Sequence, residues 1–241
     1  MLYTHSKKKC FPLAWGTGSV FGHACTYSEA SELINLLLGK GINMFDTGPS
    51  YARGKSQKLL GSCLKSSSYK REDILISTKV GSTPSKLPFF KRQKNFTKLS
   101  FEKLVKQSLN DFKTDYIDIL FLHGLPKKEI NKEAIDYLNF LKARGTIRFL
   151  GIAAHNKIDL KWTLRNTDII DIVMCHYNLI NHSEVESFLL SLKEKSIIVI
   201  GSTPFAGGLL SDRIKFEKLS TFKKDCFYFL KGLLPRQRRN N

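Results

Sequence analysis

The stretch that decides the fold is SLNDFKTDYIDILFLHG, residues 108–124. It begins with the end of an amphipathic segment, passes through a charged turn and continues as an apolar run over residues 117–122, which is followed at once by His123. A short run of Ile, Leu and Phe between polar residues is typical of a strand that is buried on both faces, as in a parallel sheet. The stretch therefore predicts a helix, a buried strand and a polar residue at the end of that strand.

The same alternation continues in both directions along the chain. Apolar runs predict strands at residues 11–15, 42–45, 74–78, 117–122, 147–152, 169–174 and 197–200. Amphipathic segments between them predict helices at residues 28–38, 56–64, 100–111, 132–143, 157–164 and 183–193. Alternation of strands and helices implies a parallel sheet with helical crossovers. We favour a (β/α)8 barrel over a doubly wound sheet, because this many units is too many for a small open sheet.

Composition and charge narrow the class of protein. The chain has 241 residues, 42% of them hydrophobic and 25% charged, which excludes wholesale disorder and fits one barrel domain over residues 1–241. No apolar run is long enough to span a membrane, and the start of the chain lacks the apolar segment of a secretory signal, so we expect a cytoplasmic protein. The net charge of +18 attracts polyanions, but no nucleic-acid-binding motif accompanies it, which disfavours nucleic acid as the partner.

The cysteines indicate neither disulfides nor a metal site. There are five, an odd number, and none of them lies in a CxxC spacing. Free thiols in a reducing compartment are the expectation, with no bound metal.

Four polar residues stand where a barrel places its chemistry. Asp46, Lys79 and His123 each follow a predicted strand directly, and Tyr51 lies five positions after Asp46. The carboxyl ends of barrel strands meet around one mouth, where active sites are found. Each residue alone has a structural explanation, such as a turn cap, a solvated strand end or ordinary packing. Together they predict a catalytic site.

Six blocks in order along the chain resemble the aldo-keto reductase superfamily. They are GINMFDTGPSYARGKSQKLLG (41–61), STKVG (77–81), SLNDFKTDYIDILFLHG (108–124), GTIRFLGIAAH (145–155), VMCHYNLI (173–180) and STPFAGGLL (202–210). The resemblance spans residues 11–210, and its last two blocks look most like aldose 1-dehydrogenases that oxidise galactose- or fucose-type sugars. It implies a (β/α)8 barrel and an oxidoreductase that transfers hydride between NADP or NAD and a small carbonyl or sugar hemiacetal substrate.

The family's catalytic tetrad falls on Asp46, Tyr51, Lys79 and His123. Hydride transfer to a carbonyl carbon builds negative charge on the oxygen, which therefore needs a proton donor. The resemblance gives this role to Tyr51. The Lys79 ammonium would favour the phenolate, Asp46 would hold Lys79 charged and oriented, and His123 would donate a hydrogen bond to the substrate oxygen.

The resemblance also implies two cofactor-binding segments. The first is Gly16, Thr17 and Gly18, with Asp46 beside it. The second is the loop after the seventh strand, whose glycines allow close backbone approach to a pyrophosphate. Its residues are Ser202, Thr203, Pro204, Phe205, Ala206, Gly207 and Gly208.

Some positions depart from the family pattern. Ala153 and Ala154 stand where many members have Ser–Asn to hold the carboxamide. Met174 stands where many have Gln, and Ser202 where many stack an aromatic ring on the nicotinamide.

The end of the chain departs most. No eighth strand is visible after residue 210; residues 216–234 predict a helix, and a basic tail follows. Either the barrel lacks its eighth unit or another segment, such as residues 82–96, replaces it. We expect weaker cofactor binding than in a complete relative, with slight discrimination between NAD and NADP. A catalytically silent barrel that serves as a binding or regulatory partner is the alternative function, and the oligomeric state is left open.

Overall fold

Seven parallel strands form the main sheet of the computed structural model, which describes residues 2–83, 93–126, 130–206 and 210. Their order in the sheet is β1-β2-β3-β6-β7-β8-β9, so each strand of this sheet lies beside its nearest sheet strands in chain order, and among the described strands only those of a separate hairpin intervene, between β3 and β6. The strands are β1 (Trp15–Gly16), β2 (Met44–Asp46), β3 (Leu75–Val80), β6 (Ile117–Leu122), β7 (Ile147–Ala154), β8 (Ile172–His176) and β9 (Ile198–Ser202). A doubly wound sheet would reverse its strand order at one point. The prediction of a barrel-type sheet is confirmed for the described residues.

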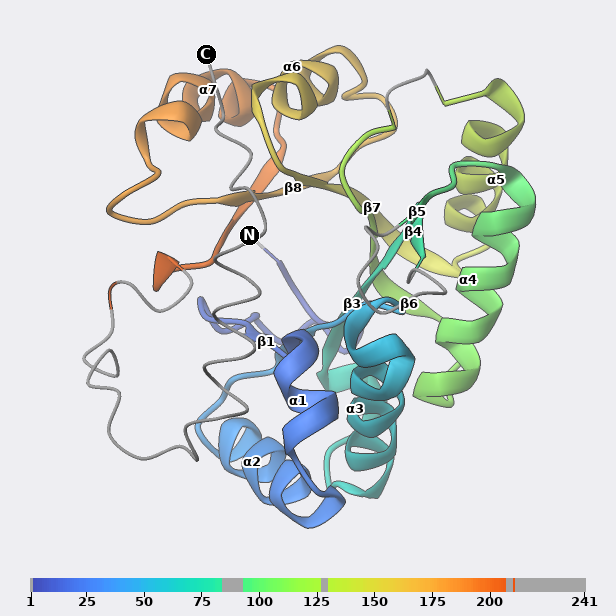
Figure 1. Ribbon diagram of the computed structural model, residues 1–241, viewed down its shortest axis with the longest axis vertical. Helices are drawn as coiled ribbons and strands as arrows, with labels where there is room; N and C mark the ends of the chain where they lie inside the picture. The colour runs from blue at the N-terminus through green and yellow to red at the C-terminus, as the bar shows by residue number, and fades with distance from the viewer. Residues whose placement is uncertain (1, 84–92, 127–129, 207–209, 211–241) are drawn as a thin grey trace, which may run out of the picture.

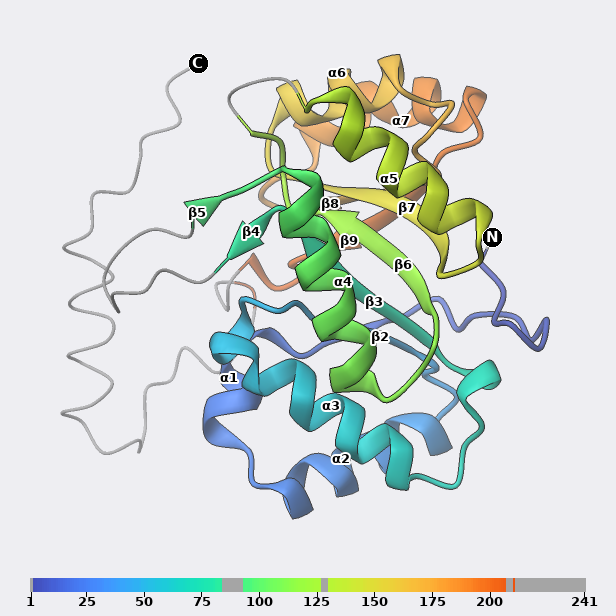
Figure 2. The same ribbon diagram turned by 90° about the vertical axis from the view of Figure 1, so that its right-hand side faces the viewer.

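The helices cover the outside of the curled sheet (Figures 1 and 2). In Figure 1, α1, α2 and α3 lie at the bottom, α4 and α5 at the right, and α6 and α7 at the top. The α-helices are α1 (Gly18–Ala24), α2 (Tyr27–Gly39), α3 (Lys55–Ser66), α4 (Lys98–Phe112), α5 (Lys132–Ala143), α6 (Lys157–Arg165) and α7 (Ser183–Glu194). Two 3-10 turns, η1 (Tyr51–Gly54) and η2 (Arg71–Asp73), lie on either side of α3.

The core has an inner and an outer layer, because successive strand residues point to opposite faces. The inner layer lies inside the curl and consists of buried Leu2, Met44, Leu75, Ile119, Phe121, Ala153, Ile172 and Met174. The alternate residues, such as Phe45, Ile76 and Leu120, pack under the helices. Counting in steps of two from the inner layer leads to Asp46, Lys79 and His123. The alternation therefore brings the predicted strand-end residues to the inside of the barrel mouth.

The structure corrects several predicted elements. The first strand was predicted at residues 11–15, but residues 11–14 are exposed and β1 begins at Trp15. Helix α1 was not predicted. Strands β4 (Ser82–Thr83) and β5 (Gln93–Lys94) pair only with each other, in an antiparallel hairpin, so the described part of residues 82–96 adds no eighth strand to the barrel. The predicted helix at 216–234 and the basic tail lie outside the described residues.

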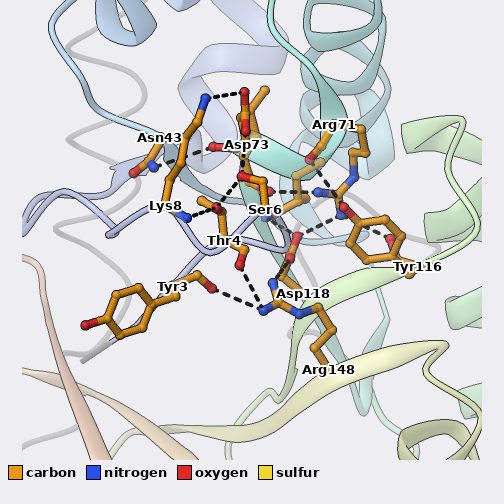
Figure 3. A network of polar contacts seen from close by, with 12 residues as sticks. Tyr3, Thr4, Ser6, Lys8, Asn43, Arg71, Asp73, Tyr116, Asp118 and Arg148 are labelled. Carbon is orange, nitrogen blue, oxygen red and sulfur yellow. Dashed lines mark hydrogen bonds and ion pairs between the residues drawn. The ribbon is translucent and has the colours of Figure 1, made fainter.

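A network of ion pairs lies at the amino-terminal ends of the strands (Figure 3). The carboxylate of Asp118, on β6, is fully buried and pairs with Arg71 at 2.7 Å and with Arg148 at 2.6 Å. Its Oδ2 also accepts a hydrogen bond from the amide of Ile76 on β3. Arg148 in turn donates to the backbone carbonyls of Tyr3 and Thr4. The network thus joins the start of the chain to the amino-terminal end of the barrel.

The structure describes four of the five cysteines and the helices that were considered as membrane spans. Cys10, Cys25, Cys63 and Cys175 are all free thiols, as predicted, and Cys226 lies outside the described residues. Burial raises the pKa of the Cys63 and Cys175 thiols to about 11. Among the described helices, none combines the length and apolarity needed to cross a membrane.

Candidate active site

A buried ion pair between Lys79 and Asp46 lies at the carboxyl ends of β2 and β3. The Lys79 ammonium donates to both carboxylate oxygens of Asp46, each at 2.6 Å, and to the backbone carbonyl of Thr47 at 2.8 Å. Ser77 donates to the same carboxylate at 2.7 Å. The Lys79 side chain is 3% exposed and that of Asp46 14% exposed. The lysine is therefore fixed in position by three acceptors within the core.

The electrostatics of this pair keep Lys79 charged. Burial alone lowers the pKa of Lys79, but the Asp46 carboxylate and the Tyr51 side chain together outweigh it, and the pKa lies above its ordinary value of 10.5. An ammonium that stays protonated is a permanent positive charge beside whatever group lies next to it. That neighbouring group is the ring of Tyr51.

Tyr51 is held over Lys79 by a tight turn. Its amide donates to the carbonyl of Gly48 at 2.9 Å, and the Lys79 Nζ lies 4.9 Å from the centre of its ring. A Cβ at Gly48 would lie at 3.6 Å from the Lys79 stem and 3.7 Å from the Tyr51 ring, so this glycine fits between the two side chains. Ala52 and Arg53 follow in the left-handed region, at φ 47° and 55°. Such residues cost about 1–3 kcal/mol each and persist only when the surroundings enforce them.

Helix α3, which begins directly after this turn, is anchored to β3. The side chain of Gln57 accepts a hydrogen bond from Thr78 at 2.6 Å and donates to Asp111 on α4 at 2.9 Å. Thr78 immediately precedes Lys79 in the sequence. Strand β3 therefore positions Lys79 on its inner face and, through Thr78, anchors helix α3 on its outer face.

His123 completes the cluster from the end of β6. It is 5% exposed, and its amide donates to the carbonyl of Val80 at 2.9 Å. Its ring meets that of Tyr51 edge to face, with the ring centres 6.3 Å apart and the planes at 80°. The structure thus brings together all four residues that the sequence singled out, around the Tyr51 ring.

The first predicted cofactor segment lies directly beside this cluster. The amide of Thr17 donates to the carbonyl of Asp46, and its hydroxyl donates to that of Thr47, both at 2.9 Å. A Cβ added at Gly16 or at Gly18 would meet no atom within 4 Å, and Gly18 has φ +54°. The backbone here borders open space in which a ligand can lie.

The second predicted cofactor segment is described only in part. Ser202 lies at the end of β9, where its hydroxyl donates to the carbonyl of Cys175 at 3.0 Å. The Thr203 carbonyl accepts from Asn178 at 3.0 Å, and Phe205 is 62% exposed. Gly207 and Gly208 lie outside the described residues.

The departures from the family pattern lie in the barrel wall. Ala153 and Ala154 at the end of β7 and Met174 in β8 are all buried, and their side chains offer no hydrogen-bond donor and only the weak thioether acceptor of Met174. They cannot hold a carboxamide through their side chains.

The sequence analysis missed His155 and His176 as members of this region. Their rings follow that of His123 at centre-to-centre distances of 5.6 Å and then 5.8 Å. Their signal was weaker than that of His123: His155 follows the predicted strand 147–152 by three residues and His176 follows 169–174 by two, whereas His123 follows 117–122 directly. Among the described residues, no group of three or more His, Cys, Asp or Glu side chains is placed to hold a metal ion.

Comparison with known proteins agrees with this geometry. The Aldo/keto reductase family model matches residues 12–225. An L-galactose dehydrogenase of Arabidopsis thaliana is 32% identical over 203 residues, which are 81% of this chain and 61% of that protein. An NADH-specific methylglyoxal reductase of Escherichia coli (strain K12) is 29% identical over 184 residues, 72% of this chain and 56% of that protein.

Solved structures show the same likeness. The holo form of an aldo-keto reductase from Bacillus halodurans aligns with a TM-score of 0.76 and 28% identity over 98% of this chain and 78% of that one. The chain spans less than two thirds of the length of the two curated relatives named above. The family match covers most of the chain. The chain belongs to the aldo/keto reductase family.

Proposed function

We propose that the protein is an NAD(P)-dependent oxidoreductase that transfers hydride between a nicotinamide and a carbonyl or sugar hemiacetal, with Tyr51 as the proton donor and acceptor. The observation that carries the proposal is the position of the Tyr51 ring, between a buried, charged Lys79 and the ring of His123. Membership of a family whose enzymes use nicotinamide cofactors supports it.

Each of the four site residues has a separate role that follows from its position. A bound reduced nicotinamide supplies the hydride. As the carbonyl carbon accepts the hydride, Tyr51 gives its hydroxyl proton to the carbonyl oxygen, and the Lys79 ammonium stabilises the phenolate that remains. Asp46 keeps that ammonium in place by accepting two of its hydrogen bonds. His123 orients the substrate oxygen, and in the oxidative direction Tyr51 accepts the proton.

The open space along Gly16 and Gly18 fits a cofactor that passes close to the backbone. It adjoins Asp46 through the Thr17 amide, so a dinucleotide there would end beside Lys79 and Tyr51. We assign Gly16, Thr17, Gly18 and Asp46 to the cofactor, together with the loop from Ser202 that includes Thr203, Phe205, Gly207 and Gly208. The choice between NAD and NADP follows from neither segment.

For the substrate, we propose a small carbonyl compound or an aldose. The relatives include an L-galactose dehydrogenase and, at 24% identity, a D-threo-aldose 1-dehydrogenase from Pseudomonas sp. The methylglyoxal reductase among them acts, by its name, on a small ketoaldehyde. The test therefore needs both substrate types.

The experiment is turnover of NADPH and NADH with a panel of aldehydes, ketones and aldoses, measured for the wild type and for Tyr51→Phe. The substitution removes the proton donor and keeps the ring, so the turnover number should fall by about 10²–10⁴-fold. Dinucleotide affinity, measured by fluorescence titration, should change by no more than a few-fold. Tyr137→Phe is the matched control, because Tyr137 stacks on Phe140 within α5, on the outside of the barrel.

Normal turnover by Tyr51→Phe would disprove the role of Tyr51. A wild-type protein that binds neither dinucleotide would replace the enzyme proposal with the silent-barrel alternative.

A further inference from the structure

Three histidines form a continuous row along the inner edge of the barrel mouth. His123, His155 and His176 stand at the carboxyl ends of β6, β7 and β8, which are neighbours in the sheet. The ring centres of His123 and His155 are 5.6 Å apart, and those of His155 and His176 are 5.8 Å apart. Two imidazoles joined by one hydrogen bond of about 3 Å have their centres roughly 5–6 Å apart. The distances between the ring centres therefore leave room for one hydrogen bond between neighbouring rings.

One end of the row reaches the candidate active site. The His123 ring contacts the Tyr51 ring edge to face, with the centres 6.3 Å apart. The other end reaches the β9 loop, where Nδ1 of His176 lies 3.0 Å from the Thr203 hydroxyl. Each ring carries two nitrogens, so an imidazole can accept a proton on one side and release one on the other.

The far end of the row also lines a polar cavity of about 230 Å³. His155 and His176 line it together with Asn156, Asn181 and Ser183. Liquid water takes about 30 Å³ per molecule, so the cavity has room for several waters with polar partners. It lies beside the row, at the ends of β7 and β8, and its walls include neither Tyr51 nor Lys79. Protons there need not pass through the space that a substrate occupies.

We propose that His123, His155 and His176 form a proton relay that connects Tyr51 to this cavity. The inference rests on the proposed function, since it explains how Tyr51 regains its proton. In the row of three rings, His155 is the positioning link, because its ring lies between those of His123 and His176.

The proton balance of one reduction is as follows. The carbonyl carbon receives a hydride, with both electrons, from the reduced nicotinamide, and the carbonyl oxygen receives the Tyr51 proton. His123 then returns a proton to the Tyr51 oxygen, His155 supplies His123, and His176 supplies His155. One proton from water or buffer in the cavity restores His176. The row ends the cycle in its initial state, and the oxidative direction sends one proton the opposite way.

Charged groups border the row on several sides. Lys79 lies beyond Tyr51, and Lys94, on β5, donates to the backbone carbonyl of His123. Asp159, on α6, accepts from the amide of His155 at 2.7 Å. Burial raises the pKa of Asp159, and the amide hydrogen bonds of His155 and Leu125 partly offset this. On α7, Glu186 pairs with His182 and accepts from the Tyr177 hydroxyl. A pH profile of the relay includes the influence of these groups.

The first test needs no cofactor and no activity. The chain has six histidines, whose ring nitrogens can be followed by NMR in the ¹⁵N-labelled full-length protein as the pH is varied. Linked imidazoles titrate together, so His155→Phe should move the titration midpoints of both His123 and His176 by about one pH unit. The midpoints of His5 and His23, which lie outside the row, should stay unchanged. Unmoved midpoints of His123 and His176 would overturn the row.

The second test asks whether the row carries protons during turnover. His155→Phe should lower the turnover number by about tenfold, less than loss of the donor itself, with KM within a few-fold. Free imidazole in the buffer should restore the rate in proportion to its concentration, an effect that a purely structural role would not produce. His5→Phe is the control, because His5 packs against Tyr116 at the opposite end of the barrel.

The outcomes separate the two proposals. A wild type without turnover on any substrate overturns the proposed function and the relay with it. An active wild type with an unchanged His155→Phe turnover number, or with a loss that imidazole does not restore, overturns the relay alone. If His155→Phe fails to fold, His155→Gln provides the same two readouts, and His176→Phe provides the midpoint of His123 and the turnover number.

Discussion

The two ends of the barrel each contain a buried carboxylate paired with basic side chains, yet they are built for different purposes. At the amino-terminal end, Asp118 accepts from two arginines and one amide, and its carboxylate is fully enclosed (Figure 3). At the carboxyl-terminal end, Asp46 accepts from Lys79 and Ser77, and the ion pair borders the Tyr51 ring at the mouth. The charged groups of the lower network contact one another and the backbone, whereas the upper pair borders Tyr51, the proposed proton donor.

The difference teaches how to separate a structural ion pair from a working one in the same fold. Both carboxylates lie mostly within the core, with side chains 0% exposed at Asp118 and 14% exposed at Asp46, and this modest difference does not by itself reveal a function. Each end has a tyrosine and a histidine near its ion pair, Tyr116 with His5 below and Tyr51 with His123 above. The distinguishing feature is the surroundings: the Tyr116 hydroxyl donates to the backbone carbonyl of Arg71, whereas the upper pair lies at the carboxyl ends of the strands, beside the open space along Gly16 and Gly18. A set of variants and a pH series sharpen this contrast.

The largest effect on stability is expected at the lower end. Asp118→Ala removes the partner of two arginines, and breaking a buried pair costs about 3–5 kcal/mol of unfolding free energy. Urea unfolding measures the loss. The matched control is Asp136→Ala, whose exposed i,i+4 pair with Lys132 should contribute about 0.5 kcal/mol or less. Equal losses in the two variants would show that the lower network is no more than a surface feature.

A smaller loss is expected for the upper pair, where Asp46 is partly exposed. Lys79→Met should cost about 3 kcal/mol, because a largely buried carboxylate is left without its partner. The double variant Asp46→Asn with Lys79→Met should recover much of this stability but none of the turnover. Strictly additive losses in this cycle would mean that the two side chains do not interact.

The pH dependence should differ in direction between the two ends, with the smallest effects of the set. The pKa of Lys79 is raised in the folded protein. The contribution of Lys79 to the free energy of unfolding is therefore complete below about pH 10.5 and declines as the pH rises toward the pKa of the folded state. The stability difference between wild type and Lys79→Met should therefore shrink in alkali. At the amino-terminal end of the barrel, hydrogen bonds from Lys8 and Ser6 lower the pKa of Asp73. The contribution of Asp73 to the free energy of unfolding therefore declines in acid, below about pH 3.8.

Unfolding curves of Lys79→Met and Asp73→Asn, each compared with wild type between pH 3 and 11, check both directions. A difference that fades in acid for Lys79→Met, or in alkali for Asp73→Asn, contradicts the assignment.

The fold was predictable where a strand is buried on both faces and therefore consists of apolar residues. Strands β3, β6 and β7 are apolar runs, and the prediction located each to within a few residues. The first strand was misplaced because Phe11 and Leu13 are apolar but exposed, and apolarity was the only signal used. Helix α1 was missed because GSVFGHA contains two glycines, which disfavour a helix interior. Tertiary contacts compensate: a Cβ at Gly22 would clash with Ser56 of α3, so the glycine allows close packing.

Helix ends were predicted less well for a different reason. Helix α2 was predicted to begin at Ser28, but the cap is Thr26, which forms a reciprocal capping box with Glu29. Both Ser28 and Thr26 are capping residue types, and only the geometry decides between them. The same ambiguity moved the start of α4 to Lys98, after a Thr97 cap.

In the candidate site, strand-end position and residue type were sufficient to select Asp46, Lys79 and His123. Tyr51 was harder, since its place depends on a turn with two left-handed residues that no periodicity reveals. The histidine row shows the complementary gap. His155 and His176 lie a few residues beyond the predicted strands, and their contact with His123 depends on the register between β6, β7 and β8, which the sequence does not state.

The most direct test of the contrast between the two ends measures stability and turnover together in Tyr51→Phe and Asp118→Ala. We predict that Tyr51→Phe loses at least about 10²-fold in turnover number, with an unchanged midpoint of thermal unfolding. We predict that Asp118→Ala loses about 10 °C in that midpoint, with turnover per folded molecule within a few-fold of wild type. The opposite pattern, a destabilised Tyr51→Phe that retains turnover and a stable Asp118→Ala that loses it, would contradict the account.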